Sequence, residues 1–323
     1  LTRPELAVLL SYSKLVAYQQ LVDSDVPEDA YLSQELERYF PELLQKKYAK
    51  AMQEHRLKRE IIATAVTNST INRMGATFLL RMQEDSGRST GEVAKAYTIT
   101  RETLDARELW AAIDGLDGKV AESVQVDALQ VIWNMQRSFT RWLLARPGAI
   151  PDITTAVARY HDGIRDIRRG EGILPDSQRP GYEASLRAEL GGQLAALPYL
   201  EPCPNIIELA RERKLKPIDV AKVYFRLAEA LRVPWLQEQI EALQVEGRWH
   251  AVARGVLRDE LAAQMRTLTA QVLAMPGANA NDKVQHWLHR DDSTLRFTLA
   301  MMSELATQKS LDYPTASVAV QRL

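Results

Sequence analysis

The side chains best suited to metal or acid–base chemistry, the five histidines, are dispersed, and only His286 and His289 lie close together. A spacing of three residues puts both imidazoles on one face of a helix, where a neighbouring carboxylate could complete a metal site. Charged residues flank both histidines, as on an ordinary exposed amphipathic helix, and two histidines are fewer ligands than a structural metal site uses. We therefore predict no metal site.

A thiol and a glycine segment are the next candidates. Cys203, the single cysteine, lies between two prolines with no adjacent histidine to activate it, so we reject a catalytic thiol. One cysteine excludes an internal disulfide framework and favours the reducing cytoplasm. The segment Gly170–Gly172 follows no strand and precedes Pro175 rather than a helix, so it lacks the context of a phosphate-binding loop. We interpret the stretch around Asp176 as a loop or short linker.

The most unusual stretch runs from residue 55 to residue 76. Helical spacing aligns two asparagines with apolar residues on one stripe, formed by Leu57, Ile61, Ala65, Asn68, Asn72 and Ala76. A buried amide needs hydrogen-bond partners, and bonding within the chain is the general expectation. The alternative is a docking surface made by Asn68 and Asn72 together with Arg56, Arg59 and Arg73.

The charge balance bears on possible partners. The chain has 41 Lys and Arg against 42 Asp and Glu, a formal net charge of −1. Nucleic-acid-binding proteins generally show a positive excess, so we predict no nucleic-acid partner. The small cluster Arg165, Arg168 and Arg169 lies at an expected helix end, where cations complement the helix dipole.

The elements that position these residues are helices. Apolar spacing of three and four residues recurs along the 323 residues, and no alternating strand pattern is convincing. Thr2 ahead of Pro4, Ser89 or Thr90 ahead of Glu92, and Asp291 or Asp292 ahead of Leu295 are candidate helix caps. Six prolines precede or begin helical stretches, at positions 27, 41, 151, 217, 234 and 314. The expected fold is an all-α multi-helix bundle.

An internal similarity indicates a duplication. Glu92–Tyr97 (EVAKAY) matches Asp219–Tyr224 (DVAKVY), and both copies end in Pro-Gly-Ala. We predict one all-helical domain over 1–323, divided into N-terminal helices (1–88), repeat A (89–150), connecting helices and loops (151–216), repeat B (217–278) and C-terminal helices (279–323). The longest stretch without a charged residue, 267–281, is interrupted by Pro276 and Gly277, so we predict no membrane span.

Two blocks of sequence resemble a known family. The opening LTRPELAVLLSYSK at 1–14, and HRLKREIIAT at 55–64 continuing to NRMG at 72–75, resemble the large bacterial NAD-specific glutamate dehydrogenases. In that family both blocks follow the catalytic domain, and a helical C-terminal region comes after. The resemblance implies that the start Leu-Thr-Arg-Pro marks a cut inside a longer enzyme of amino-acid catabolism.

The implied parent reaction converts L-glutamate, NAD and water to 2-oxoglutarate, ammonium and NADH. The resemblance places NAD and the catalytic residues upstream, so we assign no catalytic or cofactor residue here. The expected role is oligomerisation as a homo-oligomer, bracing of the upstream catalytic domain, or regulation. The alternative is an independent helical scaffold or adaptor that binds a protein partner or nucleic acid.

Overall fold

The computed structural model describes residues 1–170, 173, 186 and 188–323, and all regular structure in these residues is helical. The predicted all-α class is therefore confirmed. Most of the predicted loop around Asp176 lies outside the described residues, as do Gly172 and Pro175. The described chain forms two compact units, Leu1–Asp162 with Pro180–Glu201 (unit 1) and Gly163–Arg179 with Pro202–Leu323 (unit 2). The single domain and its five segments remain a prediction.

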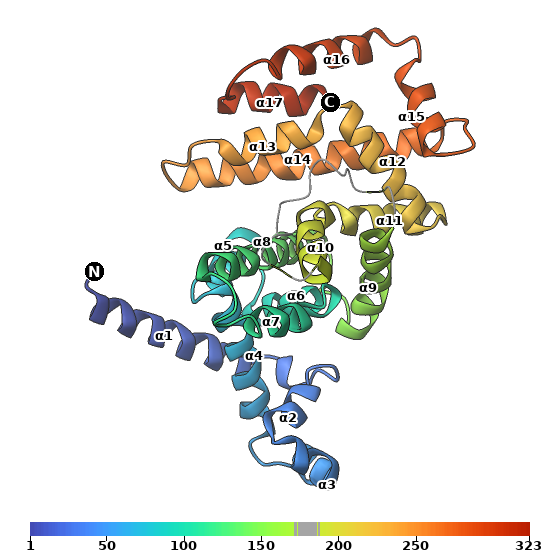
Figure 1. Cartoon of the computed structure of the whole chain (residues 1–323). Coiled ribbons are helices and arrows are strands. Elements are labelled where there is room, and N and C mark those ends of the chain that lie inside the picture. The colour runs from blue at the N-terminus through green and yellow to red at the C-terminus, as the bar shows by residue number, and fades with distance from the viewer. Residues whose placement is uncertain (171–172, 174–185, 187) are drawn as a thin grey trace. The chain divides into compact units, whose positions relative to one another are not determined.

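Unit 1 is built around one central helix, α6 (Thr90–Thr103). Its buried residues occur on every side, since α1, α4, α5, α7, α8 and the 3₁₀ turn η1 all pack against it. The other bounds are α1 (Arg3–Val22), η1 (Val26–Glu28), α2 (Gln34–Tyr39), α3 (Glu42–Gln53), α4 (Lys58–Met74), α5 (Phe78–Ser86), α7 (Ala106–Asp114), α8 (Glu122–Ala145), α10 (Ala188–Ala196) and η3 (Leu197–Leu200). Figure 1 shows these elements in blue to yellow-green.

Unit 2 has its own central helix, α12 (Pro217–Ala230), packed against α11, α13, α14 and α15. The bounds are α11 (Cys203–Arg213), α13 (Val233–Ala242), α14 (Arg248–Leu273), α15 (Ala280–Leu288), α16 (Ser293–Leu305) and α17 (Tyr313–Arg322). Helix α9 (Ile153–Arg169) begins in unit 1 and ends in unit 2. Helix α11 begins at Cys203 although Pro202 and Pro204 flank that residue, because the first turn of a helix accepts proline.

The two predicted repeats have the same order of helices. Repeat A contains α6, α7 and α8, of 14, 9 and 24 residues, and repeat B contains α12, α13 and α14, of 14, 10 and 26 residues. The residue before the short helix has a positive φ in both, 51° at Asp105 and 56° at Arg232. Since few residues other than glycine adopt this conformation, the agreement supports the duplication, which remains a prediction.

The helix ends follow local sequence rules. Thr2 and Ser89 form capping boxes with Glu5 and Glu92, and Asp292 accepts from the backbone N–H of Thr294 and Leu295. The predicted caps are therefore confirmed. No helix in the part of the chain that the structure describes has the length and apolar character to cross a membrane.

Candidate functional site

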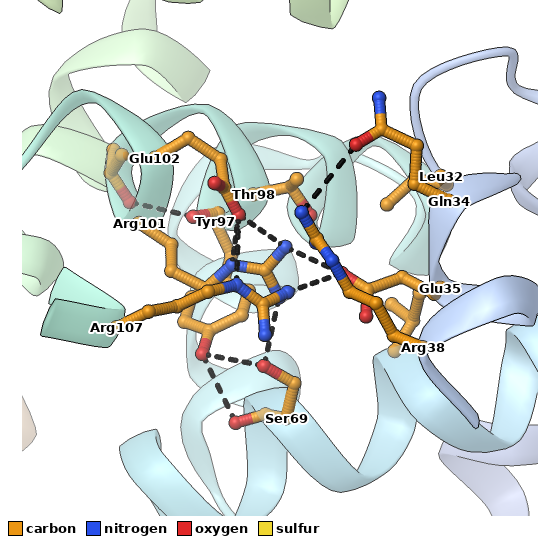
Figure 2. Close-up of polar contacts among 12 residues, drawn as sticks. Leu32, Gln34, Glu35, Arg38, Ser69, Tyr97, Thr98, Arg101, Glu102 and Arg107 are labelled. Atoms are coloured by element: carbon orange, nitrogen blue, oxygen red, sulfur yellow. Dashed lines mark hydrogen bonds and ion pairs between the residues drawn. The ribbon is translucent and has the colours of Figure 1, made fainter. Parts of the chain in front are cut away.

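Unit 1 contains a network of buried charges centred on Arg101, whose side chain is only 1% exposed. Its Nη2 lies 2.8 Å from Oε1 of Glu35 in α2 and 2.6 Å from Oε1 of Glu102 in α6. Its Nη1 donates to Oγ of Ser69 in α4 at 3.0 Å. One guanidinium group thus joins three helices, as Figure 2 shows.

Two further arginines extend the network towards solvent. Arg107, at the start of α7, pairs with Glu35 and donates from Nε to Glu102 at 3.2 Å. Arg38 lies 3.4 Å from Glu35 and is 44% exposed. The charges therefore run from the interior of unit 1, at Arg101, to its surface, at Arg38.

The protonation states follow from this arrangement. Burial alone would lower the pKa of Arg101, but the carboxylates of Glu102 and Glu35 outweigh it and raise that pKa. Burial would raise the pKa of Glu102, but Arg101 and Arg107 outweigh it and lower that pKa. Burial, with the charge and hydrogen bond of Glu102, raises the pKa of Tyr31 to about 12. At neutral pH the network thus holds charged arginine and glutamate beside a neutral phenol.

A buried tyrosine completes the network at α4. The hydroxyl of Tyr97 lies 3.1 Å from Oγ of Ser69 and donates to the Ser69 carbonyl at 3.0 Å. Burial raises the pKa of Tyr97, so its phenol stays protonated. The ring packs edge-on against Phe78 of α5, which links the polar cluster to the apolar core.

These contacts make a structural clamp rather than reactive chemistry. Each carboxylate of the cluster pairs with arginines of the same chain, and each arginine with a carboxylate. Losing one member of a buried pair is costly because the other is left uncompensated. The arrangement therefore fixes how α2, α4, α6 and α7 fit together.

Arg59, one of the predicted docking residues, is used within the chain. Its guanidinium donates to the carbonyls of Val22 and Ser24, the latter at 2.7 Å, and pairs with Glu28 of η1. These bonds satisfy carbonyl groups at the C-terminal end of α1. Arg59 thus fastens that end of α1 to α4.

Arg73 also has partners in unit 1. Its Nη2 lies 3.2 Å from Oδ2 of Asp114, and its guanidinium stacks over the ring of Trp110 with 4.6 Å to the centroid. The side chain therefore joins α4 to α7.

Arg56, Asn68 and Asn72 are placed differently. Arg56 and Asn72 are exposed and Asn68 is half-buried. The face of α4 that packs inward lies roughly opposite the expected stripe and consists of Ile62, Ala63, Val66, Thr67, Thr70 and Met74. The expectation was wrong about which face is buried, because Thr67 and Thr70 on the inward face bond carbonyl groups of the preceding turn and pack as core. The asparagines are left on an accessible face.

The remaining candidates have local roles. His286 and His289 are exposed on either side of the buried Trp287, and Nδ1 of His289 contacts the Gln285 carbonyl at 2.9 Å. Cys203 is buried, and burial raises the pKa of its thiol. In the described ranges no group of three or more His, Cys, Asp or Glu side chains is placed to hold a metal ion.

Arg165, Arg168 and Arg169 lie in the last two turns of α9, as the sequence predicted. Sequence reasoning missed Glu35 and Arg101, because charged residues within a helical stretch ordinarily lie on its solvent-exposed face. At the repeat shift Arg101 corresponds to the buried Ala228. A position-by-position comparison of repeats A and B would have revealed a charged residue in repeat A where repeat B has a buried apolar residue.

The comparisons with known proteins cover the whole chain. The family model described as "Glutamate dehydrogenase, C-terminal" matches residues 1–323. Proteins named NAD-specific glutamate dehydrogenase are 34% identical in Halomonas elongata, 34% in Pseudomonas aeruginosa and 25% in Mycobacterium tuberculosis. Each alignment covers 100% of this chain but only 20–21% of the relative. The chain thus spans about a fifth of the length of these relatives.

The chain therefore belongs to the family of glutamate dehydrogenase C-terminal regions.

Proposed function

We propose that this chain is the C-terminal helical part of a large NAD-specific glutamate dehydrogenase. The match of the C-terminal family model to all 323 residues is the observation that supports it most strongly. The whole polypeptide would oxidise L-glutamate with NAD and water to 2-oxoglutarate, ammonium and NADH. In the relatives about four-fifths of the length lies outside the region that this chain matches, and the catalytic residues would lie in that part.

NAD belongs to that other part of the enzyme. A dinucleotide site of the usual kind needs a strand, a glycine-rich turn and a helix N-terminus that meets the pyrophosphate. The described residues form helices alone, and no strand precedes a glycine-rich turn in them. The residues present therefore do not fit an NAD site, and we assign no step of the reaction to them.

The role we assign to this part is bracing of the catalytic domain and assembly of a homo-oligomer. The clamp around Arg101 holds four helices of unit 1 in one arrangement, as a supporting element requires. Arg56, Asn68 and Asn72 form the accessible remainder of the predicted docking surface. A single buried cysteine without a disulfide suits a reducing cytoplasm. The independent adaptor is less favoured, because the match spans the entire chain.

Deletion tests this division of labour. The longer polypeptide should reduce NAD when glutamate is added, whereas residues 1–323 alone should not. Removing these residues should lower activity and change the mass found by light scattering. Glutamate-dependent NADH formation by the isolated chain would contradict the proposal, as would full activity and unchanged mass after deletion.

The docking surface needs its own variant. Asn72→Arg places a bulky cation on the accessible face of α4 without touching its buried face. We expect a lower mass or activity in the longer polypeptide and an unchanged unfolding free energy in residues 1–323. The matched control is Arg81→Glu on the exposed side of α5. Equal behaviour of the two variants would remove this surface from the proposal.

A further inference from the structure

Helix α1 is apolar on all sides but is covered on very little of its surface. Its twenty residues include only three charged side chains, Arg3, Glu5 and Lys14. A helix that is apolar all round is typical of one buried on all sides. In this structure only Ala17 and Leu21 of α1 are buried.

Exposed apolar residues lie on two opposite sides of α1, and Leu9 and Val16, also exposed, lie between these sides. Leu6 and Leu10 follow the same side as Ala17 and Leu21, beyond the point where α4 and α6 contact the helix. Figure 1 shows this first half of α1 extending away from α4 towards the N-terminus. One side of the helix is therefore covered at its C-terminal end and open at its N-terminal end.

The other side is open along most of its length. Val8, Tyr12 and Leu15 are 55%, 64% and 59% exposed and follow a spacing of four and three residues. Charged residues on these sides are few: Arg3 and Lys14 flank Leu6 and Leu10, and Glu5 precedes Val8. A contiguous apolar surface of this kind marks an interaction site.

We propose that α1 is the docking helix for the catalytic part of the same polypeptide, which receives it on both open sides. This inference rests on the proposed function, since it requires that part to precede the matched region. The family model is that of the C-terminal portion, and about four-fifths of each relative lies outside it. The catalytic part would be joined to α1 at the exposed first turn of this helix. This covalent link would keep the catalytic part at a high effective concentration beside the apolar residues of α1.

The distribution of apolar residues favours this occupant over a second copy of the chain. Pairing of two α1 helices would cover one side of each and leave the opposite side in water. A domain that encloses the helix covers Leu6 and Leu10 together with Val8, Tyr12 and Leu15. The N-terminal cap of α1 is already complete: the backbone N–H of Thr2 donates to the Glu5 carboxylate, and the Thr2 hydroxyl oxygen accepts from the backbone N–H of Glu5. The helix is thus preformed for docking.

Cysteine labelling tests this contact directly. Tyr12→Cys and, as a matched control of similar exposure, Leu80→Cys on α5 are each placed in the longer polypeptide and in residues 1–323. Labelling by a maleimide is followed peptide by peptide with mass spectrometry, and the buried Cys203 serves as a slow internal reference. We expect Tyr12→Cys to react at least tenfold more slowly in the longer polypeptide and Leu80→Cys to change less than twofold.

The opposing results are distinct. A rate for Tyr12→Cys within twofold in the two proteins would overturn the docking of α1. Protection that appears in residues 1–323 as their concentration rises would assign α1 to self-association and overturn it equally. Glutamate-dependent NAD reduction by the unsubstituted longer polypeptide is measured separately. Its absence would refute the proposed function, whereas the labelling rates would still report whether α1 is covered.

Discussion

Removing Glu35 should destabilise unit 1 far more than an ordinary surface substitution does. Glu35 pairs with Arg101, whose side chain is 1% exposed, and with Arg107. After Glu35→Ala, Glu102 is the remaining carboxylate for Arg101. Breaking a buried pair costs about 3–5 kcal/mol, and with Glu102 still present we expect about 3 kcal/mol. For a domain of this size that lowers the melting temperature by roughly 6–12 °C.

The assay must separate the two units, because they need not unfold together. Pulsed hydrogen exchange with mass spectrometry along a urea titration reports unfolding for each peptide. Peptides from α2, α4 and α6 should shift their midpoints together in Glu35→Ala. Peptides from α12 and α14 in unit 2 serve as the internal reference.

Arg38→Ala is the matched control. Arg38 also pairs with Glu35, at 3.4 Å, but its side chain is 44% exposed. Exposed pairs contribute about 0–1 kcal/mol, so this variant should shift the unit 1 midpoint little. If Glu35→Ala lowered the unfolding free energy no more than Arg38→Ala, the reasoning from burial would be refuted.

Three further results are expected. Arg101 lowers the pKa of Glu102 in the folded protein, so the ionised Glu102 stabilises unit 1 fully above about pH 4.5, and this stabilisation is lost as the pH falls through the lowered pKa. Urea titrations of unit 1 at decreasing pH should show this loss of unfolding free energy. Arg101→Met should make the loss smaller. Ser89→Ala should destabilise unit 1 by about 1 kcal/mol through its lost cap, whereas Thr2→Ala at the open end of α1 should change the urea midpoint little; equal effects would contradict the packing described. Cys203 should react with a disulfide reagent only as unit 2 unfolds, since it is buried with a raised pKa; rapid reaction in native buffer would disprove its burial.

Local rules determined much of this protein. The spacing of apolar residues predicted the all-helical class, and caps such as Ser89 with Glu92 predicted where helices begin, because these signals involve residues within one or two turns. The resemblance in residues 1–14 and 55–75 predicted the family, and the family model, which matches residues 1–323, confirmed it.

Tertiary structure decided which side chains meet. Glu35 and Arg101 are 66 residues apart, and nothing in the spacing of either marks it as buried. The inward face of α4 was also misjudged, because threonines that bond their own helix pack as core. Helical periodicity thus determines that a helix has an apolar face, whereas the neighbouring helices decide which face is buried. In α1 the neighbouring helices leave most of the surface exposed.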